Sequence, residues 1–136
     1  MIVKTKLEQV LEIIQHEPNY ETFEYKGYYC VIKRMLYLGG QLNGYVRIPE
    51  NHHIYNREQH DLDIECHGGI TFGPEELKGE TGIFIGFDTA HYLDYMPFMI
   101  MMTRSGQMEN IDEGTYKDIT YVRNECKQIV EQLIKK

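Results

Sequence analysis

The sequence predicts an α+β fold in which an antiparallel sheet of about five strands is flanked by an N-terminal helix and a long C-terminal helix. Apolar residues recur with helical spacing near both ends of the chain. Between them lie runs of aromatic and β-branched residues separated by glycine-containing turns, which is the pattern of neighbouring antiparallel strands. The length of 136 residues, without a linker or repeat, predicts a single domain over residues 1–136.

The first helix is predicted over residues 4–17 and ends before Pro18. Its apolar residues follow the i, i+3, i+4, i+7 spacing of one buried face: Leu7, Val10, Leu11 and Ile14. Strands are predicted next over residues 20–25, 28–38 and 41–48. The turns between them are too short for parallel crossovers, so these strands should form an antiparallel meander.

The next stretch mixes polar segments with two predicted strands. Residues 50–59 read as a loop with a short helical turn. Polar and apolar residues alternate over 61–67, which predicts a strand that residues 70–72 extend. A charged loop is predicted over 73–82, and the apolar run 83–87 should form a buried central strand.

The last third should end in a long helix. Residues 88–97 read as an irregular segment, the methionine-rich run 96–102 as core or interface, and 104–114 as a polar loop. Thr115 should begin the helix, with Asp118 as its partner in a capping box. Its predicted buried face consists of Ile119, Val122, Cys126, Ile129, Val130 and Leu133.

Composition limits the classes of function. A net charge of −7 and a pI near 5.3 argue against non-specific nucleic-acid binding, which needs Lys and Arg to neutralise phosphates. The sequence has no apolar run long enough to cross a membrane, and its first residues do not resemble a secretory signal. The three cysteines have no CxxC spacing and should be reduced. We therefore expect a soluble, cytoplasmic protein.

Residues able to do chemistry gather between positions 52 and 94, where five of the six histidines lie. On a strand over 61–67, Asp61, Asp63, Glu65 and His67 would share one face and offer a site for Mg²⁺, Mn²⁺ or Ca²⁺. The alternative is a solvated strand face, because antiparallel sheets often expose one side to water.

A second group recurs at three-residue spacing: Asp88, His91 and Asp94. On one helical turn Asp88 would orient the imidazole of His91, giving an acid–base pair or part of a metal site. The alternative is a local turn in which Asp88 caps the following backbone.

Two further patterns suit an anionic ligand. The Gly68–Gly69 pair after His67 could bring backbone amides close to an anion, or could simply form a bend. Tyr45 and Arg47 should share a strand face, which suits a base and a phosphate, although a cross-strand surface pair is the commoner explanation.

The sequence argues against a serine hydrolase, a P-loop or dinucleotide-binding enzyme and a Cys–His enzyme. Ser105 is the only serine and no GxSxG, P-loop or GxGxxG motif occurs. Cys66 should point away from His67 on an alternating strand, which disfavours a Cys–His pair.

In five separated motifs the chain resembles a family of small, uncharacterised phage and prophage proteins. The motifs are Gly27-Tyr28-x-Cys30-Val31-Ile32, Gly44-Tyr45-Val46-Arg47-Ile48-Pro49, His67-Gly68-Gly69-Ile70-Thr71-Phe72, Gly86-Phe87-Asp88-x-Ala90-His91-x-x-Asp94 and Val122-x-x-Glu125-Cys126. The likeness spans roughly residues 26–133. Members often carry a cysteine where this chain has Thr89. A phage setting implies a small homo-oligomer in the host cytoplasm that counters host defences, in some cases by sequestering nucleotide-derived immune signals.

We therefore expect a binding protein, without a cofactor, for a small anionic nucleotide-like ligand. Its expected contacts are Tyr45, Arg47, His52, Tyr55, His67, Phe72, Asp88, His91 and Asp94. The first alternative is a metal-dependent hydrolase of a phosphate-containing small molecule, with a divalent metal held by Asp61, Asp63, His67, Asp88 and His91. The second alternative is a protein–protein inhibitor of a host factor.

Overall fold

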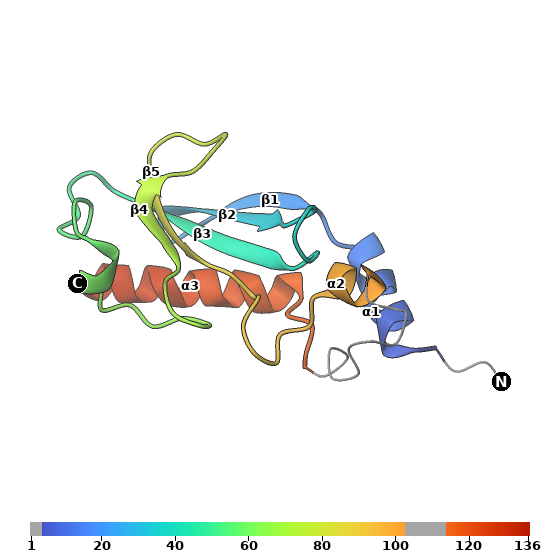
Figure 1. The fold of residues 1–136 in the computed structure, drawn as a ribbon. Helices are drawn as coiled ribbons and strands as arrows, with labels where there is room; N and C mark the ends of the chain where they lie inside the picture. The colour runs from blue at the N-terminus through green and yellow to red at the C-terminus, as the bar shows by residue number, and fades with distance from the viewer. Residues whose placement is uncertain (1–3, 103–113) are drawn as a thin grey trace.

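The computed structural model describes residues 4–102 and 114–136 and has the predicted α+β fold (Figure 1). Its elements in chain order are α1 (Lys6–Gln15), β1 (Tyr20–Tyr25), β2 (Tyr28–Arg34), β3 (Leu42–Ile48), a 3₁₀ helix η1 (Gln59–Asp61), β4 (Phe72–Glu76), β5 (Ile83–Phe87), α2 (Pro97–Met102) and α3 (Ile119–Lys135). The predicted polar loop 104–114, with Ser105, lies outside the described residues except for Gly114.

The five strands form one antiparallel sheet in the order β1-β2-β3-β5-β4. The first three strands pair as the predicted meander, with Cys30 opposite Val46 between β2 and β3. In the next pair, Val46 lies opposite Ile85, so β5 occupies the interior position expected of a short apolar strand. The edges of the sheet are therefore β1 and β4.

The main core lies between the sheet and α3, which runs beneath β2 and β3 (Figure 1). Since side chains alternate along a strand, Val46 and Ile48 face α3 while Tyr45 and Arg47 face the other way. All six residues of the predicted buried face of α3 are buried, which confirms that prediction. Each large apolar side chain buried here contributes about 1.5–3 kcal/mol to stability.

The opposite face of the sheet carries a smaller apolar cluster of Val31, Tyr45, Phe84 and Leu77. Leu77 comes from the loop between β4 and β5, so this loop covers part of that face. Tyr45 is only 6% exposed and packs edge-to-face on Phe72, with 5.2 Å between the ring centroids. Both rings are therefore packed within this apolar cluster.

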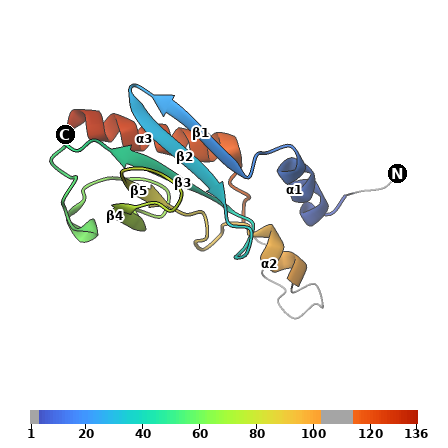
Figure 2. The ribbon, with the colours of Figure 1, turned by 90° about the horizontal axis from the view of Figure 1, so that it is seen from above.

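A third apolar cluster joins α1 and α2 beyond one end of the sheet (Figure 2). It contains Leu7, Val10, Tyr95 and Ile100. Thr5 begins α1 with the reciprocal capping box that it forms with Glu8. The methionine-rich run predicted as core or interface forms α2. None of the helices in the described ranges 4–102 and 114–136 is long and apolar enough to cross a bilayer.

The strand predicted over 61–67 is wrong. The chain forms η1 and then an irregular segment that packs along α3 and buries Ile64. Side chains of α3 satisfy its backbone: the Glu65 N–H donates to Gln132 Oε1 and the Gln132 amide donates back to the Glu65 carbonyl, each over 2.7 Å. Because these partners replace a strand neighbour, the alternating pattern does not produce a strand.

Three other predicted boundaries are also wrong. The strand predicted over 28–38 ends at Arg34, and residues 35–38 belong to the turn between β2 and β3. Residues 72–76, placed partly in a loop, form β4, where Pro74 is tolerated because an edge strand leaves some N–H groups unpaired. The long helix begins at Ile119 rather than Thr115, since the Asp118 side chain accepts from the Tyr121 N–H as the N-cap. Thr115 instead forms a bridge to Asp94.

Candidate functional sites

The residues expected to bind a ligand lie in three places. His67, Asp88, His91 and Asp94 meet on the α3 side of the molecule. Tyr45, Arg47 and Phe72 lie on the opposite face of the sheet, with Tyr55 beside Arg47. His52 lies at the end of α3, where its Nε2 donates to the Leu133 carbonyl over 2.8 Å. The predicted ligand contacts are therefore divided between two candidate sites, and His52 belongs to neither because it bonds to the last turn of α3.

The first site, called here the His67 centre, consists of His67, Asp88, His91, Asp94, Lys117 and Tyr121. Both ring nitrogens of His67 have partners: Nε2 lies 2.8 Å from Asp94 Oδ2, and Nδ1 lies 2.7 Å from the Tyr121 hydroxyl. The segment after η1, the segment after β5 and the first turn of α3 bring these three residues together. Residues far apart in sequence thus form one hydrogen-bonded row.

Asp94 lies at the middle of the His67 centre, and its side chain is only 2% exposed. It also accepts from the His91 backbone N–H over 3.0 Å and pairs with Lys117 Nζ at 3.1 Å. Burial alone would raise the pKa of Asp94, but the hydrogen bonds from His67, the His91 backbone and Lys117 hold it below its usual value. Asp94 is therefore a carboxylate at neutral pH.

His91 and Asp88 form the predicted i, i+3 pair, with 3.0 Å between His91 Nε2 and Asp88 Oδ1. This contact does not count as a hydrogen bond, and His91 Nε2 has no other hydrogen-bond partner among the described residues. Asp88 also accepts from the Thr71 hydroxyl over 3.0 Å and from the Ala90 N–H over 3.1 Å. The local cap expected as an alternative therefore coexists with the imidazole pair.

Gly68→Ala should destabilise the protein more than Gly69→Ala. Both glycines have positive φ, +69° and +82°, so both changes impose similar backbone strain. A Cβ on Gly68 would lie 2.1 Å from His91 Nε2, whereas a Cβ on Gly69 would meet nothing within 4 Å. We expect Gly68→Ala to lower the free energy of unfolding by about 1 kcal/mol more than Gly69→Ala in urea titrations, because the partly exposed His91 ring must move aside. Equal losses would contradict the contact with His91.

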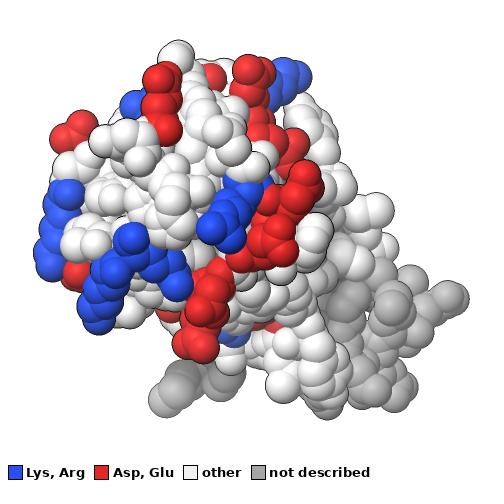
Figure 3. Space-filling model, turned by 90° about the vertical axis from the view of Figure 1, so that its left-hand side faces the viewer, with Lys and Arg blue, Asp and Glu red and all other residues white. Residues whose placement is uncertain are grey.

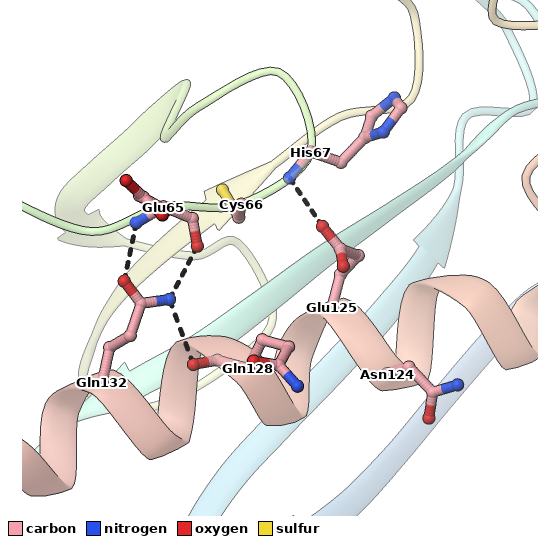
Figure 4. A pocket seen from close by; sticks show the side chains of 7 residues that line it. All are labelled: Glu65, Cys66, His67, Asn124, Glu125, Gln128 and Gln132. Carbon is pink, nitrogen blue, oxygen red and sulfur yellow. Dashed lines mark hydrogen bonds between the residues drawn. The ribbon is translucent and has the colours of Figure 1, made fainter.

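A polar groove of about 730 Å³ begins at His67 and runs beside α3 (Figure 4). It is lined by Glu65, Cys66, His67, Asn124, Glu125, Gln128 and Gln132. Glu125 holds the segment in place by accepting from the His67 N–H over 2.7 Å, while the imidazole points away from the helix (Figure 4). With two carboxylates and several amides, this groove suits neutral or cationic polar molecules.

None of the three cysteines is prepared for nucleophilic attack. Burial, together with the neighbouring Glu125 carboxylate, raises the pKa of Cys66 to about 12. Burial likewise raises the pKa of Cys30 to about 12 and that of Cys126 well above its usual value. A thiolate is the reactive form, so these thiols are packing groups.

The second site is a hollow of about 290 Å³ beside Arg47, called here the Arg47 hollow. Its lining includes Arg47, Glu50, Tyr55, Thr81 and Gly82. The Arg47 guanidinium lies over the ring of Tyr29, 4.3 Å from its centroid, and 5.5 Å from that of Phe84. Gly82 allows this packing, because a Cβ there would lie 3.1 Å from Arg47 Nε. Arg47 is therefore held in one place by stacking.

The metal site proposed as an alternative is not assembled. Asp61 lies in η1, and the exposed Asp63 lies 3.6 Å from Lys136 at the end of α3, whereas His67 contacts Asp94. Within residues 4–102 and 114–136, no three His, Cys, Asp or Glu side chains are grouped so as to hold a metal ion. The five residues that this alternative requires therefore do not form one metal site within these ranges.

Lys117 and Tyr121 belong to the His67 centre but were missed in the sequence. The available signal was a polar row beside the buried face of α3: Tyr121, Glu125, Gln128 and Gln132 recur at three- or four-residue spacing. All of these except Tyr121 line the groove.

The end of the molecule that bears the C-terminus carries mixed charge, and acidic and basic side chains lie close to one another there (Figure 3).

Comparison of the chain with protein-family models, curated proteins and solved structures found no match to any of them.

Proposed function

We propose that the protein binds a small anionic ligand in the Arg47 hollow. The observation that carries this proposal is that Arg47 lacks a carboxylate partner among the described residues. Among residues 4–102 and 114–136, no carboxylate oxygen lies within 4.0 Å of its nitrogens, and its buried Nε has no hydrogen-bond partner. Buried donors are usually paired, and leaving one unpaired costs about 1–3 kcal/mol. An anion in the hollow would give this guanidinium the negatively charged partner that the described residues do not supply.

The stacking of Arg47 favours tight binding of such an anion. A guanidinium presents a rigid planar fork that matches carboxylate and phosphate oxygens. Tyr29 supports the flat side of this fork, and the Tyr29 hydroxyl is itself held by a 2.9 Å hydrogen bond to Glu80. Since Arg47 is already ordered, little side-chain freedom is lost on binding.

The lining of the Arg47 hollow favours a nucleotide-like ligand of small size. Tyr55 offers a ring for stacking, while Glu50 and Thr81 offer oxygens to sugar hydroxyls. The volume of about 290 Å³ lies at the lower limit for ligand pockets, which favours a mononucleotide over a larger molecule. In the phage setting, such binding would withdraw a nucleotide-derived signal from the host.

Binding is favoured over metal-dependent hydrolysis because the metal ligands do not converge in the described part of the chain. Inhibition of a host protein is a second candidate function, supported by exposed apolar side chains. Tyr37, Leu38, Tyr92 and Met102 are each at least 69% exposed. Apolar and aromatic groups of this kind are enriched in protein interfaces.

Arg47→Ala should weaken binding of the probe AMP about 10- to 100-fold in isothermal titration calorimetry, because hydrogen bonds to charged groups contribute about 1.5–3 kcal/mol. Arg47→Lys should restore only part of the affinity, since lysine keeps the charge and loses the fork. Arg57→Ala removes the same charge from an exposed arginine and should leave the affinity unchanged. Absence of AMP binding to the wild-type protein, or equal weakening by Arg57→Ala, would contradict the proposal.

A further inference from the structure

The His67 centre contains a hydroxyl, an imidazole and a carboxylate in one row. The Tyr121 hydroxyl lies 2.7 Å from His67 Nδ1, and His67 Nε2 lies 2.8 Å and 3.0 Å from the two oxygens of Asp94. A nucleophile in hydrogen-bond contact with a base, and a third group that orients the base, is the arrangement that activates hydroxyl nucleophiles on unrelated folds.

The Asp94 carboxylate determines which ring nitrogen of a neutral His67 carries the hydrogen. An ionised carboxylate only accepts, so His67 Nε2 carries the hydrogen that points at Asp94. A neutral ring with hydrogen on Nε2 has its lone pair on Nδ1, so the Tyr121 hydroxyl donates to Nδ1.

We propose that Tyr121 is the nucleophile of an acyl-transfer site in which His67 accepts the phenol proton and Asp94 holds His67 in place. The substrate class is an ester without negative charge. The carboxylates near the Tyr121 hydroxyl are those of Glu125 and Asp94, and they repel anions. The groove that begins beside the His67 backbone adds the Asn124 and Gln128 amides, which can bind polar groups. This site lies on the α3 side of the sheet and is independent of the Arg47 hollow.

In the reaction, the Tyr121 hydroxyl oxygen forms a bond to the ester carbonyl carbon while its proton passes to His67 Nδ1. The tetrahedral intermediate then collapses, the bond from carbon to the leaving oxygen breaks, and its electron pair departs with that oxygen. His67 returns the proton to the leaving group, so acyl-tyrosine and an alcohol are formed without oxidation or reduction. Hydrolysis of acyl-tyrosine by water, with His67 again as base, restores Tyr121.

Reactivity at Tyr121 depends on this base. Burial, together with the nearby carboxylates of Glu125 and Asp94, raises the pKa of Tyr121, so the phenol keeps its proton at neutral pH. Its half-buried ring lies on the first turn of α3, whereas Tyr37 and Tyr92 are 98% and 89% exposed. If exposure alone governed acylation, Tyr37 and Tyr92 would react first.

The test uses 4-nitrophenyl acetate, a neutral ester, with the full-length protein. Peptide mass spectrometry at short times locates the acetyl group, and absorbance follows release of 4-nitrophenol. We expect Tyr121 to be acetylated at least about tenfold faster than Tyr37. His67→Gln should lower the rate at Tyr121 by at least about tenfold and leave the rate at Tyr37 unchanged.

Two matched variants complete the experiment. Tyr121→Phe keeps the ring and removes the hydroxyl, so it should abolish acetylation at this position and the fast release of 4-nitrophenol. His60→Gln changes an exposed histidine outside the centre and should leave both rates unchanged. Circular dichroism confirms that each variant is folded. Acetylation of Tyr121 no faster than that of Tyr37, or an unchanged rate in folded His67→Gln, would overturn the proposal, whatever the outcome with AMP.

Discussion

Arg34→Ala is expected to lower the free energy of unfolding by about 3–5 kcal/mol, because it leaves a buried carboxylate without its counter-charge. The side chains of Arg34 and Glu17 are 0% and 6% exposed, and Arg34 Nη2 lies 2.9 Å from Glu17 Oε1. The other Arg34 nitrogens donate to the Asn19 side chain, the Gly40 carbonyl and the Tyr116 hydroxyl, each over 2.8 Å. All of these acceptors would lose a donor at once.

Glu17 links this ion pair to α3. Its carboxylate accepts from the Tyr116 hydroxyl over 2.5 Å and from the Ile119 N–H over 2.8 Å. Burial and the hydrogen bond to Glu17 raise the pKa of Tyr116, so the phenol stays protonated and donates. The pair therefore joins the end of α1, the β2–β3 turn and the start of α3, and its loss should reduce the cooperativity of unfolding.

Urea titration followed by circular dichroism measures the change, and Arg123→Ala provides the control. Arg123 also pairs with a carboxylate, Glu21, but the two side chains are 37% and 21% exposed. An ion pair near the surface contributes about 0–1 kcal/mol. A loss from Arg123→Ala as large as that from Arg34→Ala would show that burial of the Arg34–Glu17 pair is unimportant.

Gly73→Ala is expected to cost about 3–4 kcal/mol, through a backbone clash added to conformational strain. Gly73 has φ +76°, and a Cβ there would lie 2.0 Å from the Phe84 carbonyl oxygen and 2.9 Å from the Glu75 nitrogen. Because both atoms belong to the backbone, relief requires β4 to move away from β5. The chain can avoid the clash only by giving up sheet pairing.

Gly79→Ala is the control for Gly73→Ala, because it introduces backbone strain without a steric clash. Gly79 has φ +85°, and a Cβ there would meet nothing within 4 Å. It should cost about 1–2 kcal/mol, the usual penalty of a left-handed conformation. Urea titration of both variants gives the difference, which should be about 2 kcal/mol. Similar stabilities would mean that β4 adapts to the extra atom.

The parts of the fold that the sequence predicted are those with a strong local period. The helical spacing of α3 identified Val122, Cys126 and Ile129 as buried because one face of that helix meets the sheet. The meander of β1, β2 and β3 followed from short turns. The segment after η1 also alternates, but Gln132 and Glu125 satisfy its backbone, and that partnership has no local signal.

The candidate sites were predicted where their members are close in sequence. Asp88 and His91 form the pair that their spacing indicated, and Tyr45 and Arg47 share a strand face. Spacing could not show that Tyr45 is buried, because that depends on the loop between β4 and β5. Nor could it bring Tyr121 to His67, since 54 positions separate them.

The two edges of the sheet have a consequence for self-association. The outer strand β1 carries Glu21 and Glu24, and the opposite edge β4 carries Pro74, Glu75 and Glu76. Repeated negative charge and a residue without an N–H both oppose the addition of a strand from another molecule. Copies of this protein that associate should therefore meet through side-chain surfaces, and their sheets should not join into a continuous ribbon.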